Sequence, residues 1–110
     1  MELAEVTALA WCDIELESID WGGEGRDIVF SLLLPEVPKR RRMLVCRWAE
    51  GLVVRLAFPD GRGGYPLTWG ATFARLPDER FSILLDFAGS GEIQLMCTDV
   101  EITEAPTDAA

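Results

Sequence analysis

The chain contains no histidine, and this absence excludes several kinds of chemistry. Neither a Ser-His-Asp nor a Cys-His catalytic arrangement can form within it, and metal sites built on imidazole are excluded as well. The sequence also has no Cys-x-x-Cys pair, no phosphate-binding loop and no calcium-binding loop pattern. We therefore predict a protein that is not an enzyme and that has no catalytic residue, no cofactor and no bound metal.

Long apolar runs are missing too. The longest, residues 28–34, is interrupted by Ser31 and is far shorter than the roughly 18 residues that a membrane-spanning helix needs. Glu2 and Glu5 stand where a signal peptide would carry basic residues. These observations predict a cytoplasmic protein without membrane association.

The three cysteines, Cys12, Cys46 and Cys97, are far apart in the sequence, and each has apolar neighbours. A free cysteine in such surroundings behaves as a small hydrophobic residue, and a reducing compartment keeps it unpaired. We expect three buried, inert thiols. A disulfide or a reactive thiol is the alternative.

Basic residues are missing from both ends of the chain. Residues 1–24 hold seven acids and residues 86–110 hold six, whereas all ten bases lie within residues 25–85 together with six acids. The net charge is −9. Such a charge disfavours nucleic acid and anionic membranes and favours a basic partner, although the same charge can serve only to keep the protein soluble.

What is present is a repeated alternation of apolar and polar residues, in short runs bounded by turn residues. With 49% hydrophobic residues in a chain of 110, one core can be buried, and the alternation is typical of β-strands. We predict an all-β protein, an antiparallel sandwich or a partly open barrel of about seven strands with at most one short helix. We expect a single β domain over residues 1–103 and a flexible acidic tail over residues 104–110. The expected strands cover residues 12–21, 27–34, 42–48, 52–58, 67–76, 81–87 and 92–103.

Several details follow from the alternation. Its phase slips by one residue near Ser18, which indicates a β-bulge. Residues 27–34 are apolar on both faces and should form a central or doubly covered strand. The basic cluster at residues 39–42 follows a proline and is expected to form an exposed loop, while residues 1–10 and 67–76 fit a helical turn as well as a strand. The expected core comprises Ile14, Leu16, Phe30, Leu44, Trp48, Leu52, Val54, Leu56, Phe58, Phe81, Ile83, Leu85, Ile93 and Leu95.

Two places in the sequence carry a family resemblance. One is the opening at residues 12–19, Cys-Asp-Ile-Glu-Leu-Glu-Ser-Ile, and the other is the pair of closing strands, residues 81–85 and 93–102, around a glycine turn. In these places the chain resembles a group of small bacterial all-β proteins, some of which are assigned as immunity proteins of toxin systems. Cys12 stands where that group usually has a histidine. The resemblance implies an all-β fold and supplies no catalytic residue.

These observations lead to two functional hypotheses. In the first, the protein is a non-enzymatic binding protein, an immunity protein that neutralises a basic partner. In the second, it is a structural or small-ligand-binding β-domain that self-associates, for example as a homodimer. The first hypothesis places partner binding on acids of the terminal strands, which point outward and are separated by a basic strand such as that carrying Arg47 or Arg55. These acids are Asp13, Glu15, Glu17, Asp20, Asp99 and Glu101.

Overall fold

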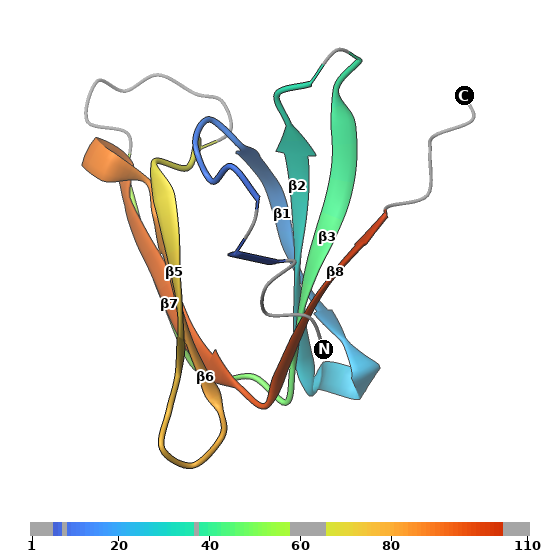
Figure 1. The fold of residues 1–110 in the computed structure, drawn as a ribbon, viewed down its shortest axis with the longest axis vertical. Coiled ribbons are helices and arrows are strands. Elements are labelled where there is room, and N and C mark those ends of the chain that lie inside the picture. Colours follow the sequence, from blue (N-terminus) through green and yellow to red (C-terminus); the bar gives the residue numbers. More distant parts are fainter. Residues whose placement is uncertain (1–5, 8, 37, 58–65, 105–110) are drawn as a thin grey trace.

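The computed structural model describes residues 6–7, 9–36, 38–57 and 66–104 (Figure 1). Eight strands in this part of the chain form two four-stranded antiparallel sheets that face each other. Helical structure in the same residues is limited to Val6 and Thr7 and to two single-turn 3-10 helices, η1 (Gly23–Gly25) and η2 (Ala88–Ser90). The predicted antiparallel sandwich is therefore confirmed, and the two sheets do not close into a barrel.

The strand order is β1-β2-β3-β8 in one sheet, here called sheet A, and β4-β7-β6-β5 in the other, sheet B. Sheet A comprises β1 (Glu15–Gly22), β2 (Asp27–Leu34), β3 (Arg40–Arg47) and β8 (Asp99–Glu104). Sheet B comprises β4 (Glu50–Leu56), β5 (Gly70–Arg75), β6 (Phe81–Asp86) and β7 (Gly91–Cys97). The apolar run at residues 27–34 thus forms an interior strand, as predicted. Residues 105–110, the rest of the predicted tail, lie outside the described residues.

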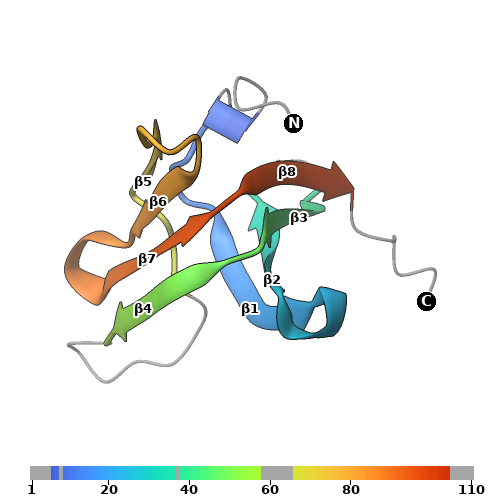
Figure 2. The same cartoon turned by 90° about the horizontal axis from the view of Figure 1, so that it is seen from below.

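Two connections carry the chain from one sheet to the other and form the corner of the sandwich (Figure 2). β3 leads into β4 through Trp48, and β7 leads into β8 through Thr98. The two long segments stay paired on both sides of the corner, because β3 pairs with β8 and β4 pairs with β7. The prediction of a single strand over residues 92–103 is therefore wrong. Its apparent phase slip marks the bend at which the chain changes sheets.

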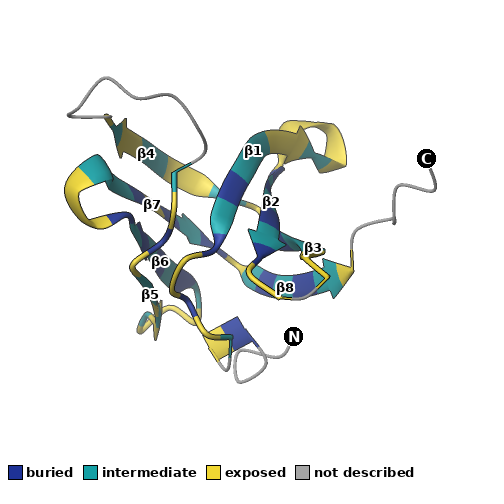
Figure 3. Ribbon diagram, turned by 90° about the horizontal axis from the view of Figure 1, so that it is seen from above, coloured by how far each residue is buried: buried dark blue, intermediate teal, exposed yellow. Residues whose placement is uncertain are grey.

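The core lies between the inner faces of the two sheets. Along β2 and β6, buried residues alternate with half-buried ones, which gives each strand one core face and one outer face (Figure 3). Burying a large apolar side chain in this way contributes about 1.5–3 kcal/mol. The expected core residues that are buried are Ile14, Leu16, Phe30, Leu44, Phe81, Ile83, Leu85, Ile93 and Leu95.

The segment before β1 lies between the two sheets at their open end (Figure 1). Val6 and Trp11 are buried there, and the Trp11 ring packs against Phe73 with 5.4 Å between ring centroids. The indole nitrogen of Trp11 donates a hydrogen bond to the Val6 carbonyl oxygen at 2.9 Å. Val6 and Trp11 therefore complete the core, and residues 6–7 and 9–14 do not belong to a strand.

Part of the predicted core lies at the surface instead. Trp48 is 57% exposed because it sits on the outside of the corner, and Val54 is 47% exposed because β4 is an edge strand of sheet B. Leu52 and Leu56 on the same edge strand are half-buried and pack against the core. Phe58 lies outside the described residues.

Residues 39–42 and Cys12 also differ from expectation. Arg40, Arg41 and Arg42 begin β3, an interior strand of sheet A, so the predicted exposed loop is wrong. Cys12 is exposed, together with Asp13 beside it, because Trp11 and Ile14 are the residues of this segment that point into the core. Long-range partners decide these positions, and a local pattern of residue types does not show them.

Two local predictions are confirmed. The pairing of β1 with β2 shifts register between Leu16 and Ser18, which is the predicted bulge. The connection between β6 and β7 is a tight turn through η2, as expected for this glycine-rich segment. Gly91 ends that turn with φ +119°, and a Cβ atom there would collide with the Arg55 carbonyl oxygen. Only glycine fits this position.

Candidate functional site

The six acids predicted to bind a partner all belong to the two edge strands of sheet A or lie directly beside them. Asp13 precedes β1, three more acids lie in β1, and two lie in β8. β2 and β3 separate the two groups, which places β1 and β8 about 14 Å apart at ordinary strand spacing. The expected basic strand between them is β3, which carries Arg47, whereas Arg55 belongs to β4 in the other sheet.

Two acids of β1 pair with bases at the start of β3 and just before it. Arg41 donates two hydrogen bonds to the Glu17 carboxylate, at 2.6 Å from Nε and 3.1 Å from Nη2. Lys39 pairs with Glu15 at 3.4 Å. The hydrogen bonds from Arg41 hold the pKa of the Glu17 carboxyl below its usual value, and they outweigh the opposite effect of partial burial. Glu15 and Glu17 are therefore largely neutralised within sheet A.

The acids of β8 also have partners within sheet A. Glu101 forms an ion pair with Arg47, and the Asp99 carboxylate accepts a hydrogen bond from the Val100 backbone N–H at 3.0 Å. Asp13 and Asp20 are the members of the predicted set that are exposed. The structure thus brings the predicted acids onto one sheet but spreads them over both of its edges, with arginines between them.

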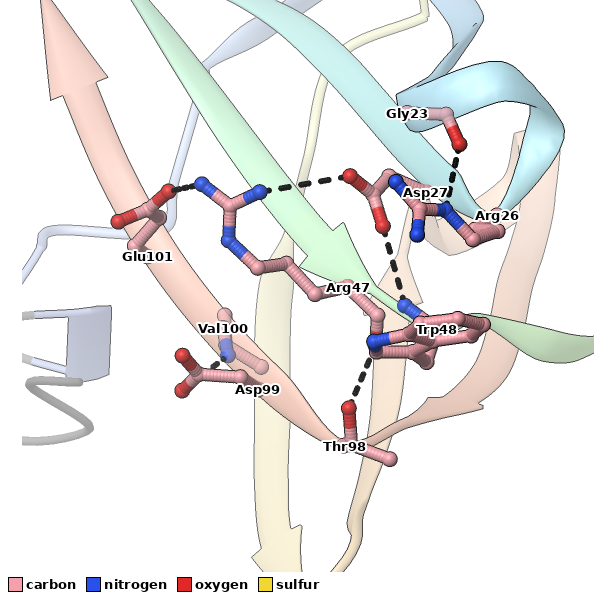
Figure 4. A network of polar contacts seen from close by, with 9 residues as sticks. All are labelled: Gly23, Arg26, Asp27, Arg47, Trp48, Thr98, Asp99, Val100 and Glu101. Carbon is pink, nitrogen blue, oxygen red and sulfur yellow. Dashed lines mark hydrogen bonds and ion pairs between the residues drawn. The ribbon is translucent and has the colours of Figure 1, made fainter.

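A second cluster of polar side chains lies at the corner of the sandwich (Figure 4). At its centre is Asp27, the first residue of β2, which is only 8% exposed. Its carboxylate accepts a hydrogen bond from the Trp48 backbone N–H at 3.1 Å and pairs with Arg47 at 3.4 Å. Trp48 has φ +53°, a left-handed conformation that is unusual for a bulky residue. The Asp27 carboxylate therefore helps to hold the backbone in the conformation that turns β3 into β4.

The side chain of Trp48 is held from the other side by the turn between β1 and β2. The Arg26 guanidinium lies over the indole ring, 4.7 Å from its centroid. Arg26 itself is fixed, because its Nε donates a hydrogen bond to the Gly23 carbonyl oxygen at 2.7 Å. Its backbone carbonyl accepts a hydrogen bond from the Ala49 N–H at 2.8 Å. An exposed indole is thus presented in a fixed orientation, which lowers the entropy lost when a partner binds it.

A shallow hollow of about 350 Å³ opens beside this indole. Within it, Arg80 forms ion pairs with Glu50 and, at 2.8 Å, with Asp78. The hollow therefore combines the aromatic ring of Trp48 with positively charged hydrogen-bond donors and a negatively charged acceptor, Glu50. Such a surface suits a polar or charged side chain of a partner. The residues that line it are Arg26, Trp48, Ala49, Glu50, Arg80 and Thr98.

The sequence did not reveal this corner. The alternation along residues 42–48 continues smoothly to Trp48, so the tryptophan was expected in the core, and the bend begins at that residue. Asp27 was expected only as the start of a strand. A signal was present in Glu50-Gly51, which marks a tight connection just after Trp48. Among the residues that the structure describes, no cluster of three or more His, Cys, Asp or Glu side chains could hold a metal ion.

Comparison of the chain with models of protein families, with curated proteins and with solved structures finds no match. Within the described residues, no helix has the length and apolar character that a membrane span requires.

Proposed function

We propose that the protein is a non-enzymatic binding protein that engages a basic protein partner, in the manner of an immunity protein that neutralises a toxin. The observation that carries the proposal is the corner of the sandwich, where Trp48 is 57% exposed and yet fixed in orientation by Asp27 and Arg26. Tryptophan and arginine are the residues most enriched among those that dominate binding energy at protein interfaces.

The charge of the chain supports a basic partner. Nineteen acids face ten bases, so a negative charge remains even where every base is paired with an acid. Asp13, Asp20 and Glu24 are exposed carboxylates on the β1 side of the molecule. Opposite charge on the two partners accelerates their encounter, and the face of the exposed indole that Arg26 does not cover offers a partner's lysine or arginine a cation–π contact.

The test begins with affinity isolation of partners by the full chain from cells that carry its gene, at low salt. Binding of each purified partner is then measured for the wild type and for Trp48→Gly, a substitution that tolerates the positive φ of this position. We expect a basic partner, slower association at high salt, and affinity lowered about tenfold or more in Trp48→Gly. Trp69→Ser is the matched control, because Trp69 is also exposed but does not line the hollow. Equal affinity of wild type and Trp48→Gly would contradict the proposal.

The alternative function, a β-domain that binds a small ligand, is favoured by the size of the hollow. Its volume of about 350 Å³ lies at the lower end of the range for small-molecule sites. A screen of charged aromatic compounds by thermal shift separates the two functions. A compound that raises the melting temperature of the wild type but not of Trp48→Gly would support the ligand-binding function.

A further inference from the structure

Two of the three cysteines meet inside the corner of the sandwich. Cys46 is the penultimate residue of β3 in sheet A, and Cys97 is the last residue of β7 in sheet B. Both side chains are fully buried, at 0% exposure, and both belong to the apolar core. Their positions are set by different sheets, so contact between them links the two layers of the fold.

The backbone brings the two cysteines close together, because the residues that follow them, Arg47 and Thr98, are hydrogen-bonded to each other. The interaction between the two thiols, together with burial, raises the pKa of the Cys46 thiol, and the same interaction lowers the pKa of the Cys97 thiol. The two thiols therefore titrate as a pair, and the proton that remains after the first ionisation stabilises the thiolate.

The backbone around the pair keeps the sulfurs together. The residues that follow the two cysteines, Arg47 and Thr98, are joined directly: the Thr98 N–H donates to the Arg47 carbonyl oxygen at 2.9 Å, and its hydroxyl donates to the same oxygen at 3.2 Å. The left-handed conformation of Trp48 then bends β3 into β4. Both cysteines thus lie on the inner side of a bend whose outer side is fixed by hydrogen bonds.

We propose that Cys46 and Cys97 form an oxidisable dithiol site, which a low-molecular-weight disulfide such as oxidised glutathione converts into a disulfide between the two sheets. One cysteine of the pair attacks, as its thiolate, one sulfur of the oxidant and displaces the first reduced thiol, leaving a mixed disulfide on that cysteine. The other cysteine then attacks, as its thiolate, the protein sulfur of that mixed disulfide and displaces the second reduced thiol. One intramolecular S–S bond forms, the S–S bond of the oxidant is broken, and both protons leave on the released thiols.

Oxidation at this site closes a loop that runs from Cys46 to Cys97 and contains all four strands of sheet B. A long closed loop restricts the unfolded chain strongly, so the oxidised form resists unfolding more than the reduced form. The new bond also fixes the angle between the sheets directly beneath Arg47 and Trp48. The redox state of the pair therefore controls how rigid the corner is.

The test uses Cys12→Ser, which removes the exposed thiol and leaves only the buried pair. The variant is incubated with oxidised glutathione at a urea concentration that permits transient opening, and the urea is then removed. We expect a product lighter than the reduced protein by two hydrogens, with Cys46 and Cys97 linked in a non-reduced peptide map. Its melting temperature should be higher by on the order of 10 °C and should return to the original value after reduction.

A matched control is Cys12→Ser combined with Cys97→Ala, which retains one buried thiol and should not form the intramolecular bond. If this control does not fold, the result for Cys12→Ser decides alone. The proposal is overturned if glutathione remains attached to single cysteines, if only linked pairs of molecules form, or if the oxidised protein melts at a lower temperature than the reduced one.

Discussion

The outer faces of the two sheets are covered by different kinds of side chains. On sheet A, the interior strand β3 presents Arg41 and Arg47 toward the acids of the edge strands, as in the bidentate pair between Arg41 and Glu17. On sheet B, the interior strands β6 and β7 place Leu84 opposite Gln94. Sheet A is therefore tied together across its strands by ion pairs, whereas sheet B combines uncharged cross-strand pairs with the pair of Arg55 opposite Glu92 near one end of β7.

This difference explains the unusual order of charges along the chain. Sheet A contains the first and last described strands, which are acidic, and its third strand, which is basic. Antiparallel pairing places the basic middle of the sequence between its two acidic ends. Much of the charge that seemed available for a partner is thus used inside the sheet, and a partner would meet the carboxylates that remain exposed.

The largest expected effect concerns what the two sheets have in common. Leu32→Ala in β2 and Leu85→Ala in β6 should each lower the free energy of unfolding by about 2–5 kcal/mol, because both side chains are fully buried in one shared core. Urea unfolding measures both losses. Val54→Ala on the exposed edge of β4 is the control and should cost less than about 1 kcal/mol. A large loss for one leucine and none for the other would mean that the sheets do not share a core.

An intermediate effect should separate the two sheets. Asp27→Ala in sheet A removes a buried carboxylate and leaves the Trp48 N–H without its acceptor, so we expect a loss of about 1–3 kcal/mol. Asp86→Ala in sheet B removes an acceptor for the Ala88 N–H at 2.8 Å in an exposed turn, and its cost should be smaller, about 1 kcal/mol. Denaturant unfolding compares the two variants. Equal losses would show that burial of Asp27 adds nothing to the corner.

The smallest effect is a dependence of stability on pH that arises in sheet A. The pKa of Glu17 is lower in the folded protein than its usual value of 4.5, because Arg41 donates hydrogen bonds to the carboxylate, so the folded state favours the ionised form. The resulting stabilisation is present above about pH 4.5 and is lost as the pH falls through the lowered folded pKa.

Glu17→Gln should therefore be less stable than the wild type at neutral pH by under about 1 kcal/mol, with the difference vanishing in acid. The control is the same substitution in an Arg41→Gln background, where the difference should be small at every pH. A difference that persisted without Arg41 would mean that another group stabilises the carboxylate.

The sequence was a good guide to features that depend on neighbouring residues. The bulge in β1 followed from the shift of apolar residues at Ser18, and the interior position of β2 followed from its two apolar faces. The turn before Gly91 followed from the glycine-rich segment itself. In each of these cases the residues that determine the structure lie within about ten positions of one another.

The candidate site at the corner depends on residues far apart in the sequence. Asp27 accepts a hydrogen bond from Trp48, and Arg47 pairs with both Asp27 and Glu101. Nothing in the local alternation separates a strand that continues from one that bends into a second sheet. The exposure of Val54 also depends on distant parts of the sequence. It arises because β4 is an edge strand, which only the complete topology shows.

The placement of the consecutive strands β7 and β8 in different sheets has a consequence for how the molecule folds. Sheet B gains the partner of β4 only when β7 is present, and sheet A gains its fourth strand only with β8. These pairings join distant parts of the chain, such as Arg47 with Asp99, and proteins rich in such pairings fold in milliseconds to seconds, more slowly than helical proteins of similar size. During synthesis, sheet B cannot be completed before β7 has left the ribosome, and sheet A cannot be completed before β8 has done so.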